Sequence, residues 1–266
     1  ARLCRQLNVP CIVLAGSTDG SREIINKYQD RISKIIFEPD NGPADGLNKG
    51  FRNSTGDVLA FVNADDFLLS GALTKVAHVF SNSPDIDVVY GNGYVINAEN
   101  RILRRIVADP FNLRRFLHGC VTFTQPSMFI RRDAFFSVGG FNVDNKTCWD
   151  AELLIELGRT GKKIVRLNAY LSAFRIHDSS ISGSGRMRER YLADWERIFR
   201  RISGRPRGWH DTLFGIAARL EKWALNPAGL AIHIFDKLYP QAIRTLSSDL
   251  LKSTSEAYQQ VQNADE

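Results

Sequence analysis

Short apolar runs alternate with amphipathic segments along the first third of the chain. Residues 9–15, 34–39 and 57–62 form apolar runs, and polar or glycine-rich residues follow each of them. The run at 57–62 is continuous, as in strands that are buried on both faces of a sheet. Segments with apolar residues at helical spacing follow at 21–32, 46–54 and 72–82. Strands that alternate with helices predict an α/β domain with a mostly parallel central sheet.

The pattern becomes less regular after residue 91. A hairpin is expected around residues 98–100, and further strands at 126–132, 162–168 and 170–177. Between these strands, residues 149–157 read as a helix with an acidic first turn.

From residue 186 onward the apolar residues recur at helical spacing, with breaks at Gly204–Pro206 and Asn226–Pro227. We place a boundary within residues 182–185. The sequence therefore predicts an α/β domain over residues 1–185 and a helical C-terminal extension over residues 186–266.

Length and composition are those of a chain that can bury a sizeable core. The 266 residues are 44% hydrophobic and 24% charged, which excludes a disordered or fibrous protein. No apolar run reaches the roughly 18 residues that a membrane-spanning helix needs, and no basic-then-apolar signal opens the chain. The cysteines form no CxxC pair, so neither a zinc site nor a disulfide framework is indicated; they are Cys4, Cys11, Cys120 and Cys148. We expect a cytoplasmic protein, with peripheral contact to the inner membrane face as an additional hypothesis.

The positive charge is concentrated in two segments. Residues 101–132 hold seven arginines and one aspartate, an excess equal to the whole net charge of +6. Residues 186–208 hold eight arginines and three acids, with Tyr191, Trp195 and Phe199 at helical spacing. This second segment is compatible with docking on anionic headgroups, or with an amphipathic helix whose aromatic stripe packs on the α/β domain. No nucleic-acid recognition motif accompanies the arginines, so no nucleic-acid partner is expected.

Polar residues stand where three of the expected strands end, and such strand ends form the ligand site of open α/β sheets. One of these segments contains the adjacent acids Asp65 and Asp66, which repel each other unless a cation or hydrogen bonds compensate. Mg²⁺ and Mn²⁺ prefer one or two carboxylates together with phosphate oxygens, which suits a nucleotide-diphosphate site. The alternative is that Asn63 to Asp66 forms only a turn and helix cap.

The segment GSTDGS at residues 16–21 has two interpretations as well. Ser17 or Asp19 can cap the following helix through its free backbone N–H groups. In the second interpretation Gly16, Ser17 and Asp19 face a nucleotide at the N-terminus of that helix.

Six motifs together resemble the family 2 glycosyltransferases of the GT-A type. They are GSTDGS, EPDNGPADGLNKGF, STGDVLAFVNADD, QPSMFIRRDAFFSVGGF, WDAELLIELG and FRIH, and they occur in the family's order over about residues 9–182. The resemblance implies a GT-A-type nucleotide-sugar-binding domain with Mn²⁺ or Mg²⁺ as cofactor. The donor would be a nucleotide-diphospho-sugar, with UDP as the first guess for the nucleotide.

The resemblance also assigns roles to individual residues. Asp65 resembles the metal ligand of the DxD-type motif, with Asn63 in its first position and Asp66 assisting. Three residues of DGLNKG match positions that line the nucleotide pocket: Asp45, Asn48 and Lys49. Arg175 and His177 resemble the late basic residues that approach the diphosphate or the metal. His177 could instead be a strand-end histidine that bonds a carbonyl group.

Asp150 resembles the catalytic base of the family. An acceptor hydroxyl is a weak nucleophile, so a carboxylate within hydrogen-bond reach must remove its proton as it attacks the anomeric carbon. Direct displacement inverts the anomeric configuration. The alternative for Asp150 is an acid that the dipole favours at a helix N-terminus. Gln125 and Trp149 are expected near the acceptor, Trp149 either stacking on a sugar or packing in the core.

Two family features have no counterpart here. The family's opening strand is absent and would lie upstream of Ala1, and Leu14–Ala15 stand where the family has an acid that recognises the base. The leading hypothesis is an inverting, metal-dependent glycosyltransferase of polysaccharide or cell-surface glycan biosynthesis, with a glycan or lipid-linked acceptor. The alternative is a non-catalytic GT-A-like binding domain that has lost recognition of the donor base.

Overall fold

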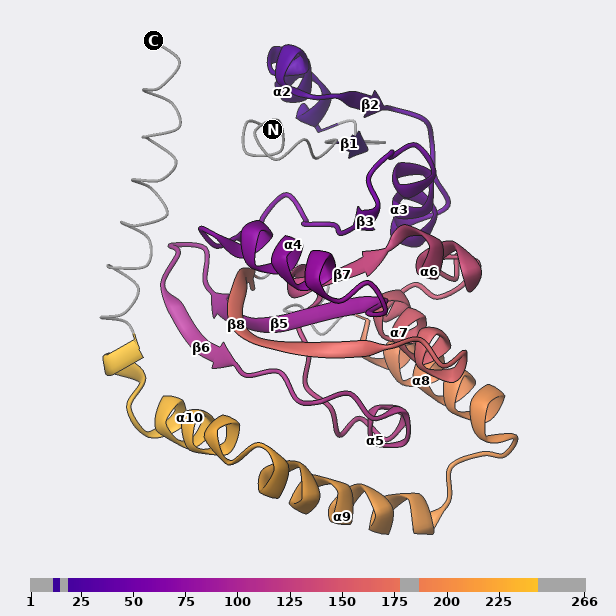
Figure 1. The fold of residues 1–266 in the computed structure, drawn as a ribbon, viewed down its shortest axis with the longest axis vertical. Helices are drawn as coiled ribbons and strands as arrows, with labels where there is room; N and C mark the ends of the chain where they lie inside the picture. The colour runs from indigo at the N-terminus through magenta and orange to yellow at the C-terminus, as the bar shows by residue number, and fades with distance from the viewer. Residues whose placement is uncertain (1–11, 15–18, 178–186, 244–266) are drawn as a thin grey trace.

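The computed structural model of the chain describes residues 12–14, 19–177 and 187–243. A curled sheet carries helices on both faces, and a further pair of helices runs along one side of this core (Figure 1). The predicted α/β class is confirmed.

The main sheet has six strands in the described part of the chain. They are β3 (Val58–Leu59), β4 (Phe67–Leu68), β5 (Val88–Ile96), β6 (Ile102–Ile106), β7 (Met128–Arg131) and β8 (Ile164–Arg175). Their order is β3-β7-β5-β8-β4, and β6 pairs with β5. Two other strands, β1 (Ile12–Leu14) and β2 (Lys34–Ile36), form a separate parallel pair.

The main sheet is mixed, whereas the sequence pattern predicted mostly parallel strands. Only β5 and β8 pair in parallel in it, and its other described pairings are antiparallel. The hairpin expected around residues 98–100 explains the antiparallel pairing of β5 with β6, because a tight turn can join only antiparallel strands. The predicted strand at 57–62 is also shorter than expected and is confined to β3.

Strand β5 is buried on both faces. Val88 and Tyr90 of β5 belong to the large core cluster, whereas Val89 faces a second cluster under α4 (Ala72–Asn82). Alternate side chains of a strand point to opposite faces, so one run of apolar residues supplies two cores. The sequence pattern assigned burial on both faces to residues 57–62, whereas in the structure β5 shows it.

Two glycines let β5 and β8 approach each other where their register shifts. A Cβ at Gly91 would lie 2.5 Å from Leu171 Cδ1 and 2.8 Å from Ala169 O. A Cβ at Gly93 would lie 2.7 Å from Thr124 Cγ2. The register of the β5–β8 pair shifts between Gly91 and Gly93, so these positions allow the sheet to bend.

Helices cover the sheet and extend the chain beyond it. Besides α4, they are α2 (Ser21–Lys27), α3 (Pro43–Arg52), α5 (Leu113–Leu117), α6 (Arg132–Ser137), α7 (Trp149–Arg159), α8 (Arg188–Ser203), α9 (Trp209–Leu225) and α10 (Pro227–Leu238). Two 3-10 turns lie at Gln29–Arg31 and Gln125–Ser127.

Helix α8 packs its apolar side on the α/β core. Ile198 and Phe199 are fully buried in the large core cluster, and Trp195 packs against it. The aromatic stripe of this basic segment therefore packs inward, as one of the two interpretations required. Tyr191, at the start of the stripe, is 43% exposed.

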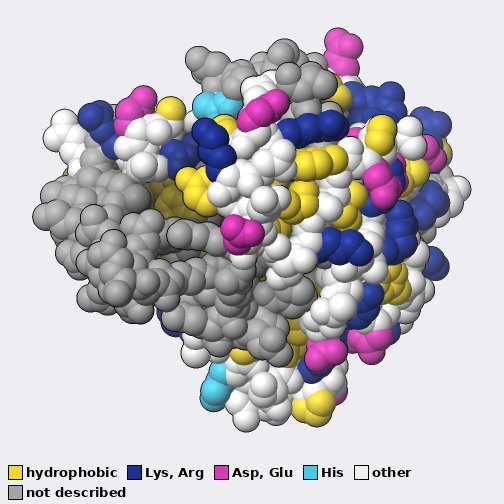
Figure 2. Space-filling model, turned by 90° about the horizontal axis from the view of Figure 1, so that it is seen from above, with side chains coloured by type: hydrophobic (Ala, Val, Ile, Leu, Met, Phe, Trp, Pro, Cys, Tyr) yellow, Lys and Arg dark blue, Asp and Glu magenta, His cyan; other side chains and the backbone are white. Residues whose placement is uncertain are grey.

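Several arginines of residues 101–132 are engaged within the fold. Arg131 donates to the backbone carbonyls of Phe80 and Ile86, and Arg132 donates to that of Ser54. On the face seen in Figure 2, side chains of both charges are interspersed over the described residues. No helix in the described ranges is long and apolar enough to cross a membrane.

Candidate functional site

The turn at residues 63–66 joins β3 to β4 and carries the two adjacent acids. Asp66 donates its backbone N–H to Asn63 O at 3.1 Å, and the Asn63 amide donates to Asp66 Oδ2 at 2.9 Å. The second carboxylate oxygen, Asp66 Oδ1, accepts the backbone N–H of Arg175 at 2.8 Å. Asp66 therefore holds the turn against the end of β8.

Asp66 is directed into the protein. Its residue is only 9% exposed, and burial raises the pKa of its carboxyl, while the hydrogen bonds from Arg175 and Asn63 act in the opposite direction. Both carboxylate oxygens are engaged in internal hydrogen bonds. Asp66 thus orders the turn through these bonds, and Asp65, whose side chain is 36% exposed, is the more accessible of the two acids.

Asp65 lies beside His177, which follows β8. His177 Nε2 is 3.0 Å from Asp65 Oδ2, and the two side chains are 32% and 36% exposed. The histidine thus contacts a carboxylate at the open edge of the sheet.

Arg175 joins this turn to the β5–β6 hairpin. Its Nε donates to Asp65 O at 2.8 Å, Nη1 donates to Asn97 O at 2.7 Å, and Nη2 donates to Asn100 Oδ1 at 2.6 Å. Asn100 has a φ of 62°, in the left-handed region that Asn tolerates in turns. All three guanidinium nitrogens are engaged, so the geometry favours a positioning role for Arg175 over a direct contact to a diphosphate.

The residues around Asp65 fit a divalent cation whose coordination is completed by substrate. Carboxylate and imidazole are both ligands that Mn²⁺ accepts. Within the described ranges, no group of three or more His, Cys, Asp and Glu side chains is arranged to hold a metal. A cation at Asp65 and His177 would therefore need further oxygen ligands, and phosphate oxygens are the ones that such metals prefer at nucleotide sites.

Helix α3 places the three residues of the predicted nucleotide pocket in different surroundings. Asn48 is buried, and its side chain exchanges two hydrogen bonds with the backbone of Phe141, at 2.8 and 2.9 Å. Lys49 Nζ donates to Pro39 O at 2.5 Å and lies 3.2 Å from Asp45 Oδ2. Asp45 also accepts the backbone N–H of Asn41, and this bond above all lowers the pKa of its carboxyl.

These contacts divide the three α3 residues. Asn48 fixes the loop that follows α6, while Asp45 and Lys49 hold the loop that enters α3. No described contact joins any of the three to Asp65 or His177.

The first strand–helix loop is described only in part. Gly16 and Ser17 lie outside the described residues. Asp19 is exposed and accepts the backbone N–H of Ser21 at 3.2 Å at the start of α2. The bond to Ser21 lowers the pKa of the Asp19 carboxyl. Asp19 precedes the N-cap residue Gly20, which has no side-chain cap bond, so this contact is an Asx-turn that leads into α2.

Asp150 lies in the first turn of α7. Its carboxylate accepts the backbone N–H of Ala151 at 2.8 Å. Desolvation raises the pKa of this carboxyl to about 6. A carboxyl with a pKa near the operating pH is suited to taking up a proton from a substrate. No described contact joins Asp150 to Asp65.

The two residues expected near the acceptor are held by the core. Gln125 Nε2 donates to Phe61 O at 2.8 Å, just before the 63–66 turn. Trp149 packs against the large core cluster, and its buried Nε1 has no hydrogen-bond partner among the residues that the structure describes. The core-packing interpretation of Trp149 is confirmed.

Sequence reasoning did not single out Glu152, one turn after the start of α7. It is 2% exposed and forms ion pairs with Arg197 at 2.8 Å and Arg201 at 3.0 Å, both on α8. It also accepts the side-chain amides of Asn142 and Asn145. Burial opposes its ionisation, but the hydrogen bonds from Arg197, Asn145 and Asn142 outweigh it and lower the pKa of Glu152.

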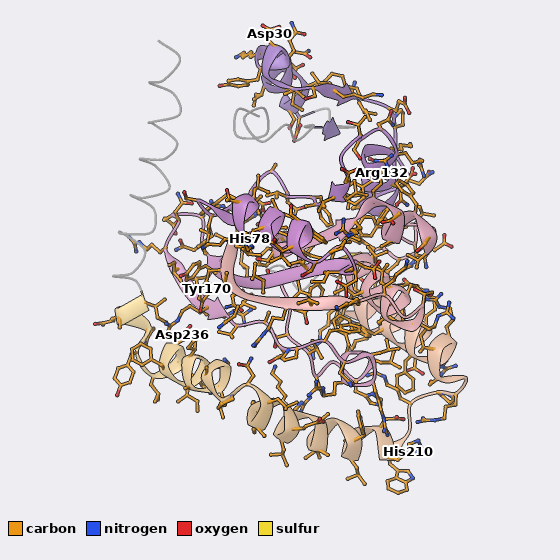
Figure 3. The ribbon with its side chains drawn as sticks, viewed as in Figure 1. Asp30, His78, Arg132, Tyr170, His210 and Asp236 are labelled. Atoms are coloured by element: carbon orange, nitrogen blue, oxygen red, sulfur yellow. The ribbon has the colours of Figure 1, made fainter. Side chains whose placement is uncertain are left out.

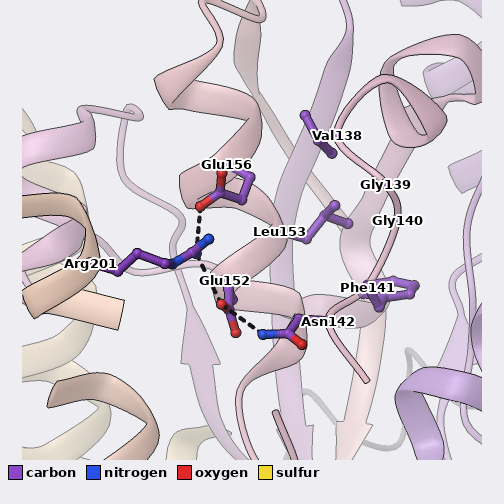
Figure 4. Close-up of a pocket in the computed structure, with 9 residues that line it drawn as sticks. All are labelled: Val138, Gly139, Gly140, Phe141, Asn142, Glu152, Leu153, Glu156 and Arg201. Atoms are coloured by element: carbon purple, nitrogen blue, oxygen red, sulfur yellow. Dashed lines mark hydrogen bonds and ion pairs between the residues drawn. The ribbon is translucent and has the colours of Figure 1, made fainter. Parts of the chain in front are cut away.

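Glu152 borders a cavity of about 160 Å³ between α7, α8 and the loop after α6 (Figure 4). In the sequence, Glu152 looks like any acid of a helix. Its role was not visible there because its partners, Arg197 and Arg201, lie 45 and 49 residues further along the chain. The cluster fixes α7, the helix that carries Asp150, against α8.

Comparison with known proteins identifies relatives of the chain. The sequence profile described as Glycosyl transferase family 2 matches residues 6–139. An uncharacterized glycosyltransferase of Nostoc sp. is 35% identical over 95 residues, covering 32% of this chain and 30% of its own. The PGL/p-HBAD biosynthesis glycosyltransferase of Mycobacterium bovis is 28% identical over 145 residues, covering 52% of this chain and 54% of its own. The chain thus spans about half or less of the length of these curated relatives.

Solved structures share the fold at low sequence identity. Staphylococcus aureus TarS 1–349 in complex with UDP-GlcNAc has a TM-score of 0.58 and 15% identity, over 92% of this chain and 72% of its own. The mannosyltransferase PcManGT of Pyrobaculum calidifontis, in complex with GDP-Man and Mn²⁺, has a TM-score of 0.54 and 14% identity, over 92% and 76%. The predicted GT-A-type architecture is confirmed. With its sequence profile matched over half of its length, the chain belongs to glycosyl transferase family 2.

Proposed function

We propose that the chain moves a sugar from a nucleotide-diphospho-sugar to a hydroxyl group of a glycan or lipid-linked acceptor, with inversion at the anomeric carbon. The observation that carries this proposal is the Asp65–His177 pair, which lies partly exposed where β3 and β8 end. The proposed setting is polysaccharide or cell-surface glycan biosynthesis.

The donor is proposed from the site and from the structural neighbours together. Strand ends of α/β sheets are where nucleotides bind, and the neighbours hold UDP-GlcNAc and GDP-Man. We take UDP as the first nucleotide to test and GDP as the second. Asp45 and Lys49, which hold the loop that enters α3, are proposed to line the nucleotide pocket, as the resemblance implies.

Asp65 and His177 are the residues that would hold Mn²⁺ or Mg²⁺. A divalent cation there would supply positive charge against the negative charge that develops on the leaving nucleotide diphosphate. Asp66 and Arg175 would keep the two ligands in place, since Asp66 bonds the backbone of Arg175 and Arg175 bonds that of Asp65.

Asp150 is the proposed catalytic base. Its partly buried carboxyl, with a pKa raised to about 6, is ionised at neutral pH but remains a better proton acceptor than an ordinary aspartate. It would take the proton of the acceptor hydroxyl as that oxygen attacks the anomeric carbon. The Glu152 cluster would hold α7 in the position that this step requires.

A melting-temperature screen tests the donor proposal. The chain is melted with UDP, GDP, CDP or dTDP, each with and without Mn²⁺, because a ligand that binds only the folded state raises the melting temperature. We expect one nucleotide to stabilise the wild type in a Mn²⁺-dependent way and to lose this effect in Asp65→Asn. Asp85→Asn, a change in an exposed surface ion pair, serves as the control.

The same screen separates the proposal from its alternative. Stabilisation by nucleotides that does not depend on Mn²⁺ or on Asp65 would contradict the assigned site. No stabilisation by any nucleotide would favour the GT-A-like domain that no longer recognises a donor base, for which Leu14–Ala15 is the motivating feature.

A further inference from the structure

The outer face of α9 carries a continuous stripe of exposed apolar side chains. They recur at i, i+4, i+7, i+11 and i+14, the spacing that places residues on one side of a helix. The stripe consists of Trp209 (76% exposed), Leu213 (56%), Ile216 (51%), Leu220 (59%) and Trp223 (43%).

The opposite face of α9 is already used for contacts with the core, which fixes the direction of the stripe. Asp211 Oδ1 lies 3.1 Å from His118 Nε2, and the Phe214 ring lies 4.4 Å from that of His118. Further along, Ala218 is buried and Lys222 pairs with Asp109 at 3.0 Å. One face of α9 is therefore apolar and exposed, and the opposite face contacts the core. The stripe cannot turn toward the core without breaking these contacts.

Helix α10 extends the same outer layer. Asp236 faces inward, where its carboxylate accepts the backbone N–H and the guanidinium of Arg105 on β6. Ile234, Leu238 and Tyr239 are 47%, 65% and 57% exposed. In Figure 3, His210 and Asp236 mark the two ends of this layer, which runs along the side of the molecule away from α4.

The acidic side chains of this layer form ion pairs, whereas two of its cationic side chains do not in the described part of the chain. Its three acids are paired with arginines: Asp211 with Arg205, Glu221 with Arg115, and Asp236 with Arg105. Arg219 and Lys237 are exposed, and neither forms an ion pair within the described ranges. The net character of the layer is therefore apolar with unpaired cations.

We propose that the outer face of α9 and α10, over residues 209–239, docks on the surface of an anionic lipid bilayer. Apolar side chains of a surface helix insert at the headgroup boundary, and exposed Arg and Lys extend their charge to anionic headgroups. Tryptophans at both ends of the stripe and Tyr239 suit this boundary, where one side of the ring is apolar and the other wet.

A second copy of the chain fits this face less well. Self-pairing through the stripe would bring Arg219 and Lys237 of one copy toward cations of another. The acids of the layer already have arginine partners: Asp211 and Asp236 are buried, and Glu221, whose side chain is 57% exposed, lies 3.5 Å from Arg115. Anionic headgroups complement the same charges. This surface is separate from the sugar-transfer site, so the proposal stands or falls independently of the donor chemistry.

Vesicle flotation of the 266-residue chain tests the proposal. The probes are vesicles of phosphatidylcholine alone and of phosphatidylcholine with about 30% phosphatidylglycerol, each at low and high salt. We expect binding to the anionic vesicles only, weakened at high salt. Leu213→Gln combined with Leu220→Gln should reduce the bound fraction at least tenfold, while Leu103→Gln, at an exposed leucine of β6, should leave it unchanged.

Two further measurements decide between occupants. Trp emission should shift to shorter wavelength on adding anionic vesicles, and this shift should disappear when Trp209 and Trp223 are both replaced by Phe. Binding that is unaffected by the double leucine change, or no binding, would overturn the proposal. A dimer in size-exclusion chromatography that the double leucine change dissociates would overturn it in favour of a second copy.

Discussion

His177 Nε2 lies 3.0 Å from Asp65 Oδ2, although 112 residues separate the two in the chain. The contact brings the turn after β3 to the residues after β8, at the open edge of the sheet. Arg175 and Asp66 support it through hydrogen bonds between the same two segments. One carboxylate and one imidazole are thereby presented together, with a more buried acid holding them in place.

Replacing the proposed base separates catalysis from binding. Asp150→Asn keeps the shape of the side chain but removes its ability to accept a proton, so we expect sugar transfer to fall about 10²- to 10⁴-fold. Nucleotide affinity, measured by calorimetry, should stay within about twofold of wild type. Loss of affinity in parallel with activity would instead assign Asp150 to the donor site.

The raised pKa of Asp150 predicts the pH dependence of the reaction. Because the carboxyl must be ionised to accept a proton, transfer should rise as the pH increases through about 6 and level off above it. A rate profile recorded between pH 5 and pH 8 checks this. In Asp150→Asn the residual rate should lack this rise, and a profile that keeps it would trace the titration to another group.

The same group has an opposite effect on stability. Its pKa is raised from 3.8 to about 6 by burial, so the folded protein binds the proton more tightly than the unfolded chain does. Its contribution therefore favours folding below pH 3.8 and is lost as the pH rises through about 6. At pH 8 we expect Asp150→Asn to melt at a higher temperature than wild type, with a smaller difference at pH 5. Equal melting temperatures at pH 8 would show that ionised Asp150 carries no desolvation cost.

Much of the fold was predictable because its signals are local. The helix expected at residues 72–82 and the acidic start of α7 lie where the pattern indicated. Whether neighbouring strands run parallel or antiparallel was not predictable, because it depends on which strands become neighbours. Strand β7 pairs with both β3 and β5, and these pairings join segments that are distant in the sequence. Periodicity identifies a strand but does not choose its partner.

For the site, residue types were predictable but their individual contacts were not. The motif placed Asp65, Asp66 and Arg175 in one region, and the structure brings them together. The motif could not show that the side chains of Asp66 and Arg175 form hydrogen bonds with other groups of the protein. The exposed stripe of α9 was equally hidden, because periodicity marks an apolar face without saying whether the core covers it.

Arg175 should prove to be a positioning residue. Arg175→Lys removes hydrogen bonds to Asn97 and Asn100 in the β5–β6 hairpin, and we expect a loss of about 2 kcal/mol in the free energy of unfolding. Chemical denaturation measures this, and Arg101→Lys, at an exposed position of the same hairpin, should change little. If Arg175→Lys is as stable as wild type but binds nucleotide much more weakly, Arg175 contacts the diphosphate after all.

The Glu152 cluster should matter to the stability of the fold. Glu152→Ala removes the buried partner of Arg197 and Arg201 at the α7–α8 interface, and both arginines are partly exposed, so we expect a loss of about 1–3 kcal/mol in unfolding free energy. Glu156→Ala, on the same helix, should cost much less because its contacts lie nearer the surface. Similar costs for the two variants would contradict the central role of Glu152.

The most direct test is a double-mutant cycle on Asp65 and His177, read out as the affinity for the stabilising nucleotide with and without Mn²⁺. If the two residues hold one cation, either single alanine variant removes most of the Mn²⁺ dependence, and the second change then costs little more. The account predicts this strong non-additivity, with no effect of either variant when Mn²⁺ is absent. The account would be contradicted if the two single variants lowered the nucleotide affinity by independent factors that multiply in the double variant. A Mn²⁺ dependence of the affinity that survives in the double variant would contradict it as well.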